Sequence, residues 1–336
     1  MNSTKSKIAI IGAGSIGILI GGLLLRAGED VTLVTRQKYA DAMNKNGLTI
    51  EGAFGDFKVP SRAAAKLDFK PDLALLTVKS QDVDSMCEQT KDYIEGVPLL
   101  TLQNGVESDQ LASSVVGKDN IISGIIMFNA NFKGGGVVQS GRDGTLIIGE
   151  AFQENGSRVN NIAEVLNKGV KTVVKDNVAG GRWSKLIANI LGNSLEAMTG
   201  MPNKVCLQYP NLRENGIMQV REAFNILNKT GVKLSSLPGL PIHVFETIMK
   251  SPMVIPSELL KVAFGNVTTT SSTLQSLKRG VPSEIDYLNG EIVKRGKEFQ
   301  LPTPYNAKVV ELIHNIEKTG KFYSPEEIEK IFSDIN

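Results

Sequence analysis

The sequence has few of the residues that build metal centres and disulfide frameworks. Its 336 residues include two cysteines, two histidines and one tryptophan. Cys87 and Cys206 lie far apart without a Cys-x-x-Cys spacing, and only His243 and His314 could join them as ligands. We therefore expect no metal site and no disulfide framework. Both histidines are expected to pack or to lie on the surface, and the cysteine usage predicts a cytoplasmic protein.

An excess of charge of either sign is also missing. The chain has 37 Lys and Arg against 35 Asp and Glu, a net charge of +2. This balance excludes a broad basic surface for nucleic acid or for an anionic membrane, so any anion site must be local. No charged leader with a cleavage site is expected before the first strand. The length and the hydrophobic share of 41% predict two globular domains.

No charged residue lies between Lys7 and Arg26. A membrane span is one interpretation of this stretch, but 18 residues are marginal for a bilayer of about 30 Å. Gly12, Gly14 and Gly17 instead have the Gly-x-Gly-x-x-Gly spacing of a dinucleotide-binding turn between a strand and a helix. The spacing also arises by chance in glycine-rich chains. Its place after a strand and before a helix favours a phosphate site at the helix N-terminus.

The end of the second expected strand, Val31–Thr35, bears on the choice of cofactor. An acidic residue at this point binds the ribose 2′-hydroxyl of NADH, whereas a nearby Arg suits the 2′-phosphate of NADPH. This sequence has no acid there, and Arg36 follows the strand. NADPH is therefore favoured over NADH, with a solvated surface Arg36 as the alternative.

Two further expected strands end in polar residues. The strand 72–78 leads into Lys79, and the strand 98–102 leads into Gln103, Asn104 and Gly105. Ligands of open parallel sheets lie beyond the carboxyl ends of the strands, so Lys79 and Asn104 are placed to reach a cofactor or substrate. A simple turn at Asn104 and Gly105 is the alternative.

The remaining pattern predicts a doubly wound, Rossmann-type α/β domain over residues 1–175 and an all-helical domain over 176–336. In the first domain, residues 48–59 look irregular, the segments 121–127, 137–140 and 145–148 extend the sheet, and a helix at 159–167 precedes a strand at 170–174.

The first helix of the second domain carries a polar stripe. Lys185, Asn189 and Asn193 recur at every fourth position, which places them on one face of a helix whose other residues are largely apolar. The stripe is expected to line a cleft. An exposed polar face is the alternative, although such faces usually mix Glu with Lys.

A second polar cluster follows a hydroxyl-rich run, Thr268–Ser272. Pro282 and Ser283 are expected to open a helix, with Ser283 as the cap and Asp286 in the place of the usual Glu or Gln of a capping box. That interpretation leaves Glu284 to face the cleft.

With these pieces in order, the chain resembles the ketopantoate reductase (2-dehydropantoate 2-reductase) family over nearly its whole length. The matching features are the glycine turn, Arg36, Lys79, Gln103-Asn104-Gly105, Trp183-x-Lys185-Leu with Asn189 and Asn193, Ser272, and Ser283-Glu284-Ile-Asp286-x-Leu-Asn289-Gly290.

The resemblance implies reduction of 2-dehydropantoate by NADPH. It implies that Lys185 is the general acid and that Glu284 helps to hold the substrate. The residues expected to bind the cofactor are Gly12, Gly14, Ser15, Gly17, Arg36, Lys79 and Asn104. The residues expected to bind the substrate are Asn104, Lys185, Asn189, Asn193, Ser272 and Glu284.

Three positions depart from the family pattern and bear on the substrate: Ser276, Ser283 and Gln139. Other interpretations are a reductase of another 2-oxo acid, an NADP-dependent dehydrogenase of an opine, polyol or hydroxyacyl thioester, a nucleotide-sensing regulator without turnover, and a structural Rossmann protein. A homodimer is left open. The apolar segment 252–256 is expected either to cover a cleft or to join subunits.

Overall fold

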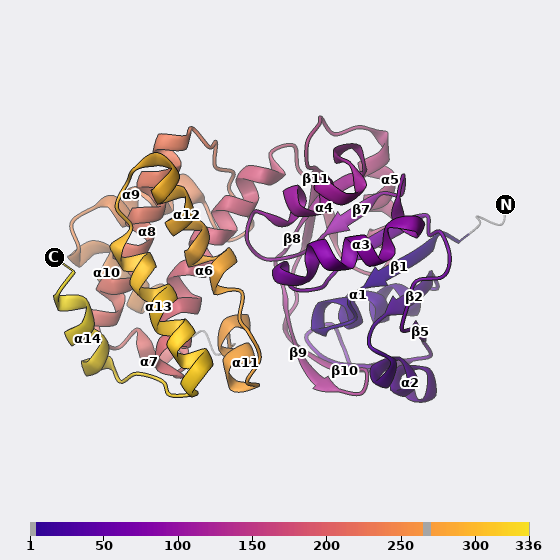
Figure 1. The fold of residues 1–336 in the computed structure, drawn as a ribbon, viewed down its shortest axis with the longest axis horizontal. Coiled ribbons are helices and arrows are strands. Elements are labelled where there is room, and N and C mark those ends of the chain that lie inside the picture. Colours follow the sequence, from indigo (N-terminus) through magenta and orange to yellow (C-terminus); the bar gives the residue numbers. More distant parts are fainter. Residues whose placement is uncertain (1–4, 265–269, 336) are drawn as a thin grey trace. The chain divides into compact units, whose positions relative to one another are not determined.

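The computed structural model describes residues 5–264 and 270–335. The chain forms two compact units, unit 1 over Met1–Ala179 and unit 2 over Gly180–Asn336. In the described residues, every named strand belongs to unit 1, and unit 2 is built of helices (Figure 1). The α/β class with a helical C-terminal part is thus confirmed. The domain boundary expected near Lys175 falls between the last strand and the next helix, and it stays a prediction.

The main sheet of unit 1 has the strand order β12-β11-β8-β7-β6-β1-β2-β5. Neighbours from β8 to β5 are parallel, whereas β11 is antiparallel to β8. The chain runs outward from β1 to β5 and then returns to begin β6 on the other side of β1, which creates the switch point of a dinucleotide-binding fold. The strands are β1 (Lys7–Ile11), β2 (Asp30–Val34), β5 (Arg62–Ala64), β6 (Leu73–Leu76), β7 (Leu99–Thr101), β8 (Ile121–Ile126), β11 (Leu146–Glu150) and β12 (Thr172–Val174).

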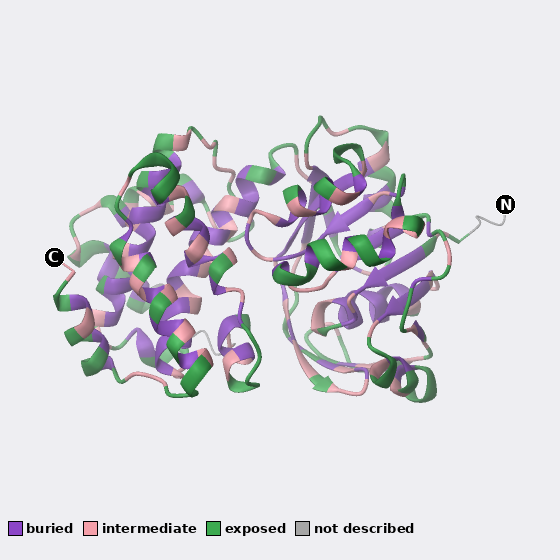
Figure 2. Cartoon of the chain, in the orientation of Figure 1, coloured by how far each residue is buried: buried purple, intermediate pink, exposed green. Residues whose placement is uncertain are grey.

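Helices cover both faces of this sheet. Side chains alternate along β1, so Ile8 and Ile10 join the core on the face of α1 and α5, while Ala9 and Ile11 join the core on the face of α3 and α4. All four are fully buried, and the strands of the main sheet are drawn largely in purple, the colour of buried residues, in Figure 2. The helices of unit 1 are α1 (Ser15–Arg26), α2 (Gln37–Asn46), α3 (Val83–Ile94), α4 (Ser108–Val116) and α5 (Ser157–Asn167), with short 3-10 turns η1 (Ser80–Asp82) and η2 (Lys118–Asn120).

A second sheet corrects two expectations from the sequence. Residues 48–59 are not irregular but form β3 (Leu48–Gly52) and β4 (Phe57–Val59). Residues 137–140 do not extend the main sheet, because β10 (Val137–Arg142) pairs with β3 and with β9 (Asn129–Gly134) in the order β4-β3-β10-β9. The pairing of β3 with β10 is parallel and aligns Thr49 with Val137. Local sequence patterns do not reveal a partner so distant in the chain.

Helix α1 packs between the two sheets, against β2 on one side and against β3, β9 and β10 on the other. A Cβ on Gly17 would lie 2.6 Å from the Thr77 hydroxyl, and one on Gly22 would lie 3.0 Å from Ile50 Cδ1. A helix that is enclosed on all sides has no place for a charged side chain, which explains the charge-free stretch. Across the described ranges, no helix has the length and apolarity needed to cross a membrane.

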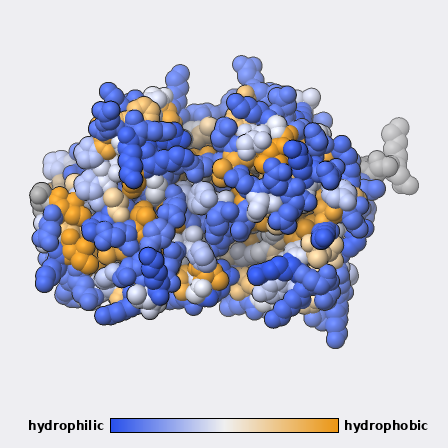
Figure 3. Space-filling model, in the orientation of Figure 1, coloured by the Kyte–Doolittle hydropathy of each residue, from blue (hydrophilic) through white to orange (hydrophobic). Residues whose placement is uncertain are grey.

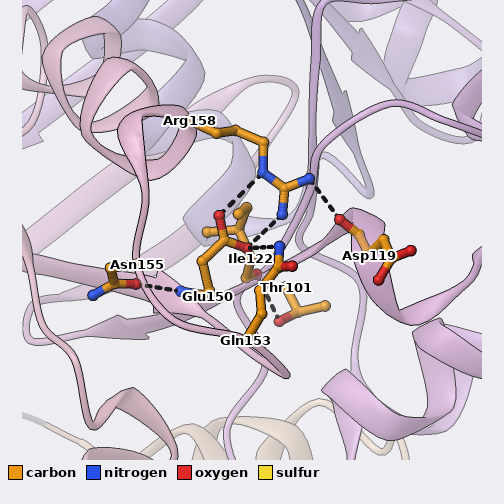
Figure 4. Close-up of polar contacts among 7 residues, drawn as sticks. All are labelled: Thr101, Asp119, Ile122, Glu150, Gln153, Asn155 and Arg158. Atoms are coloured by element: carbon orange, nitrogen blue, oxygen red, sulfur yellow. Dashed lines mark hydrogen bonds and ion pairs between the residues drawn. The ribbon is translucent and has the colours of Figure 1, made fainter.

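An ion pair between the buried Glu150 and the half-buried Arg158 lies at the edge of the main sheet opposite to the carboxyl ends of the parallel strands. Because β11 runs antiparallel to β8, Glu150 lies beside Ile122, near the start of β8. Its carboxylate pairs with Arg158 of α5, and the Arg158 guanidinium also donates to the Asp119 carbonyl (Figure 4). The Glu150 backbone N–H donates to Asn155 Oδ1 over 2.8 Å. These contacts join β11, α5 and η2 away from the site and are structural.

Unit 2 is arranged around α8 (Pro210–Thr230), which contacts α9, α10, α12, α13 and α14. Thr268 and Thr269 of the hydroxyl-rich run lie outside the described residues. The other helices are α6 (Val178–Thr199), α7 (Asn203–Cys206), α9 (Ile242–Lys250), α10 (Val254–Phe264), α11 (Ser272–Lys278), α12 (Asn289–Phe299), α13 (Pro304–Thr319) and α14 (Pro325–Ser333), with the 3-10 turn η3 (Ile285–Tyr287).

Exposed hydrophobic side chains gather on α9 and α10. Val254 is 67% exposed and Val262 is 78% exposed, and Val244, Ile255 and Leu259 are also exposed. The face drawn in Figure 3 is mostly hydrophilic, with hydrophobic residues in separate groups. The segment 252–256 thus places Val254 and Ile255 at the surface, and its expected role in covering a cleft or joining subunits stays a prediction.

The packing of α1 predicts that Gly17→Ala destabilises unit 1. The new methyl group would meet Thr77 and the Gly12 carbonyl oxygen at 2.6 and 2.9 Å. Overpacking of this kind costs about 1–3 kcal/mol. Urea unfolding of the wild type, Gly17→Ala and the control Gly14→Ala measures the effect. The control adds a methyl group 4.0 Å from its nearest neighbour, so its midpoint should stay near that of the wild type. Equal midpoints for all three proteins would contradict this account of the packing.

Candidate functional site

The turn after β1 leads into the N-terminus of α1, whose N-cap residue, Gly14, is exposed. Gly12 adopts φ +95°, and its N–H donates to the Val34 carbonyl over 2.9 Å. A Cβ at Gly12 would lie 2.6 Å from Val78 N, so only glycine fits there. Gly14 is the N-cap of α1 and has no side chain to occupy the first N–H groups of the helix. Together with the positive end of the helix dipole, these groups favour an anion at this point.

Arg36 follows β2 and is the N-cap residue of α2. Its side chain is exposed, and its guanidinium carbon lies 5.2 Å from the centre of the Tyr39 ring. Thr35 stands where an acidic residue would bind a ribose 2′-hydroxyl. The nearest acid along α2, Asp41, accepts a hydrogen bond from Gln37 Nε2 over 2.6 Å. This corner of the sheet therefore presents a cation at the end of β2.

Lys79 and Asn104 lie at the carboxyl ends of β6 and β7, which are neighbours in the sheet. Both residues are half-buried, and Lys79 is the N-cap residue of η1. The buried hydroxyl of Ser80 donates to the Asn104 carbonyl over 3.1 Å and so links the two loops. The structure thus brings the expected residues of unit 1 to one edge of the sheet, along β7, β6, β1 and β2.

Two buried side chains that sequence reasoning did not assign hold this edge together. Gln103 Nε2 donates to two carbonyl oxygens at the end of β6 over 2.9 and 3.0 Å. The Asp109 carboxylate accepts hydrogen bonds from the hydroxyls of Thr101 on β7 and Ser123 on β8. Gln103 therefore shapes the loops rather than serving a ligand through its amide N–H groups. In the sequence, Asp109 is simply an acidic residue at the start of a helix, and nothing there indicates that it binds the two hydroxyls.

The polar stripe of unit 2 lies on α6. Lys185, Asn189 and Asn193 are all half-buried, whereas Leu186 and Ile190 on the apolar side of the helix are fully buried. The helix thus has the expected division into a core face and a polar face. Its polar face presents one ammonium group and two amides.

Glu196, one turn beyond Asn193, ties this helix to the hydroxyl-bearing segment. It is fully buried, and its two carboxylate oxygens accept hydrogen bonds from Asn203 N over 2.9 Å and Ser271 N over 2.6 Å. Ser271 caps α11, and Ser272 is the exposed first residue of that helix. The start of α11 is thereby anchored to α6. In the sequence, Glu196 is a single acidic residue in a largely apolar helix, which indicates a buried carboxylate with partners, and the sequence analysis did not use this indication.

Glu284 lies on a loop whose structure differs from the expected one. No α-helix begins at Ser283. Glu284 is the N-cap residue of the short turn η3, and α12 begins only at Asn289. Ser283 Oγ does accept from Ile285 N over 3.3 Å, but Asp286 contacts His314 instead of completing a capping box. Glu284 itself is half-buried, and its pairing with Lys185 stays a prediction.

A buried amide network fixes the end of the Glu284 loop. The Asn289 side chain donates to Gln219 Oε1 and to Asn306 Oδ1, each over 2.9 Å. Asn306 in turn donates to the Glu222 carboxylate over 2.7 Å. Burial raises the pKa of Glu222, and the hydrogen bonds from Asn306 and Tyr305 act in the opposite direction. The network joins the first residue of α12 to α8 and α13.

The cysteines and histidines differ in their burial and in their polar contacts. Burial raises the pKa of Cys87 to about 12 and that of Cys206 to about 11, so both thiols stay protonated and unreactive. Within the parts of the chain that the structure describes, no group of His, Cys, Asp and Glu is arranged to hold a metal ion. His243 is exposed, whereas His314 contacts two carboxylates.

Two protein-family models match the chain. The model described as ketopantoate reductase PanE/ApbA matches residues 8–153, and the model described as ketopantoate reductase PanE/ApbA C terminal matches residues 177–317. A 2-dehydropantoate 2-reductase of Pyrococcus horikoshii is 32% identical over 316 residues, which cover 94% of this chain and 98% of that protein.

Solved structures of similar proteins share the fold of this chain. A PanE/ApbA family ketopantoate reductase from Ralstonia eutropha aligns with a TM-score of 0.79 at 31% identity, covering 93% of this chain and 99% of that one. A ternary structure of D-mandelate dehydrogenase with NADH and anilino(oxo)acetate aligns with a TM-score of 0.81 at 21% identity, with the same coverage. The second likeness shows a shared fold alone.

Proposed function

Because the chain belongs to the ketopantoate reductase family, we propose that it reduces 2-dehydropantoate to pantoate with NADPH, a step that serves pantothenate and coenzyme A synthesis. The observation that carries the proposal is the pairing of two features in one chain. Unit 1 has a glycine turn at the switch point of its main sheet, and unit 2 has a half-buried Lys-Asn-Asn stripe on α6.

The carboxyl edge of unit 1 suits a dinucleotide. The first turn of α1, which begins at Ser15 and includes Gly17, offers N–H groups for the pyrophosphate, and Gly12 and Gly14 form the turn that leads into it. Asn104 and Lys79 lie along the same edge, toward β7. At the end of β2, Arg36 without an acidic neighbour favours a 2′-phosphate, which supports NADPH over NADH. When bound, this cofactor supplies the hydride of the reaction.

The cofactor assignment predicts that Arg36→Asp weakens NADPH binding far more than NADH binding. A charge-assisted phosphate contact contributes about 1.5–3 kcal/mol, so NADPH affinity should fall roughly tenfold to a hundredfold. Fluorescence titration with each cofactor measures the effect. Lys45→Asp, at the exposed far end of the same helix, is the matched control and should change neither affinity appreciably. Unchanged NADPH affinity in Arg36→Asp would remove the basis of the assignment.

The residues of unit 2 supply the acid and the substrate contacts of the proposed mechanism. A protonated Lys185 polarises the substrate ketone and then gives its proton to the alkoxide oxygen as the carbon accepts hydride. Asn189 and Asn193, on the same face of α6, donate hydrogen bonds that hold the substrate. Glu284 binds the substrate hydroxyl and keeps Lys185 in its ammonium form. Ser272 of this unit and Asn104 of unit 1 are assigned to the substrate carboxylate.

This mechanism predicts that Lys185→Ala lowers kcat by at least about a hundredfold while the protein still folds and binds NADPH. Glu284→Ala should mainly raise the KM for the keto acid, because it removes a binding contact, with some loss of kcat because Lys185 loses its anionic partner. Steady-state assays that follow NADPH absorbance measure both constants. Lys204→Ala removes an exposed lysine of the same unit and is the matched control. A nearly fully active Lys185→Ala protein would require another proton donor.

The same assay tests the substrate and the rival functions. A site built around a substrate hydroxyl rejects an analogue without it, because its buried polar groups are left unpaired. We expect kcat/KM for 2-dehydropantoate to exceed that for 2-oxoisovalerate by at least about a hundredfold. Equal turnover of both acids would indicate a related reductase of another 2-oxo acid. Binding of NADPH without turnover of any 2-oxo acid would indicate a regulator.

A further inference from the structure

The loop that carries Glu284 is attached to α13 on both sides of that residue. One position before Glu284, the Ser283 backbone N–H donates to Glu317 Oε1 over 2.8 Å. Two positions after it, Asp286 Oδ1 lies 3.0 Å from His314 Nε2. His314 Nδ1 lies 2.9 Å from Glu317 Oε2, so an imidazole joins the two attachments. We call Asp286, His314 and Glu317 the α13 clamp.

The geometry of the α13 clamp follows from helix periodicity. His314 and Glu317 are three residues apart and therefore lie on one face of α13, about one turn from each other. Glu284, between the two attached positions, is followed by the fully buried Ile285. A backbone hydrogen bond thus holds the residue before Glu284, the side chain of Asp286 ties the loop after it, and the packing of Ile285 fixes the residue in between.

The charges of the α13 clamp fit a protonated imidazole. Partial burial acts to lower the pKa of His314, but its hydrogen bonds to Glu317 and Asp286 outweigh burial and raise the pKa above its usual value. The pKa of Glu317 is lowered: burial opposes this, but the hydrogen bonds from Ser283 and His314 outweigh it. An imidazolium donates from both ring nitrogens, one to each carboxylate. The carboxylates of Asp286 and Glu317 thus accept both N–H groups of the His314 imidazolium and balance its charge.

Overall stability is a weak explanation for this arrangement. The side chains of His314 and Asp286 are 39% and 61% exposed, and exposed ion pairs add little to the free energy of unfolding. The local effect is larger, because a four-residue loop that is tied at both ends loses most of its alternative conformations. Substrate-binding groups depend on such fixed placement, since a displacement of about 1 Å can cost a large factor in rate.

We propose that Asp286, His314 and Glu317 are positioning residues that hold Glu284 in the orientation that binds the substrate hydroxyl. The inference rests on the proposed role of Glu284. The clamp residues do not touch the substrate themselves. They act through the backbone of residues 283–286, and η3 is the element that they hold.

The first test is a KM-against-kcat comparison in a double-mutant cycle. His314→Gln should raise the KM for 2-dehydropantoate about tenfold, with the KM for NADPH unchanged and kcat within about twofold of the wild type. Adding His314→Gln to Glu284→Gln should raise KM no further, because the clamp acts through Glu284. The other histidine is exposed on α9, and its variant His243→Gln is the matched control, with constants like those of the wild type.

Each result of the cycle has a distinct meaning. A raised KM in Glu284→Gln with an unchanged KM in His314→Gln overturns the positioning role and leaves the proposed function intact. Additive increases in the double variant also overturn it, since they show an effect that bypasses Glu284. An unchanged KM in Glu284→Gln overturns the substrate role of Glu284 and the positioning role with it.

The second test observes the imidazole directly, because the chain has only two histidines. In His243→Gln protein, the ring signals of only one histidine remain in the NMR spectrum, and their titration gives the pKa of His314. That pKa should lie above the ordinary value of about 6.5 and should fall in the additional variant Asp286→Asn. A pKa at or below the ordinary value, or one that does not respond to Asp286→Asn, overturns the clamp.

Discussion

The close approach of α1 to the main sheet is the constraint on which unit 1 depends. The glycines of its first turns let the helix lie where a methyl group at Gly17 would meet Thr77 and the Gly12 carbonyl oxygen. This approach brings the helix N-terminus to the carboxyl edge of the sheet, where the N–H groups remain accessible to an anion. The second sheet then covers the outer side of α1. Burial of the helix and exposure of its N-terminus are therefore two results of one packing arrangement.

The sequence predicts the parts of this fold that are specified locally. The first strand, its glycine turn and α1 follow from a short apolar run and three spaced glycines, and the α6 stripe follows from helical spacing alone. The second sheet was missed because β3 and β4 are short strands beside Gly52 and Gly55, and their partner β10 lies far along the chain. Whether an apolar segment joins one sheet or another depends on contacts that a local pattern does not contain.

The residues of the candidate site also divide into those that the local sequence predicts and those that depend on distant contacts. Lys79 and Asn104 were predicted to reach a ligand because ligands of open parallel sheets lie beyond the carboxyl ends of the strands, and Arg36 was predicted from its place after the second strand. The residues that hold the loops in place were not predicted. Glu196 acts on a backbone N–H 75 positions away, and Glu317 acts on one 34 positions away. Their side chains carry ordinary charges, and only the tertiary fold decides that one is buried and the other faces the Glu284 loop.

The parallel pairing of Thr49 with Val137 has a consequence for synthesis of the chain. Helix α1 is complete once residue 26 has been made, but the sheet that covers its outer side needs the strands up to Arg142. During translation, the outer side of the apolar helix α1 therefore stays uncovered until β10 has been made. Contacts between residues so far apart in the sequence form slowly. Exposed apolar surface on an incomplete domain is a target for chaperones and a risk for aggregation. The glycine turn thus precedes most of unit 1 in the chain, yet the helix that follows it is among the last elements of unit 1 to be enclosed.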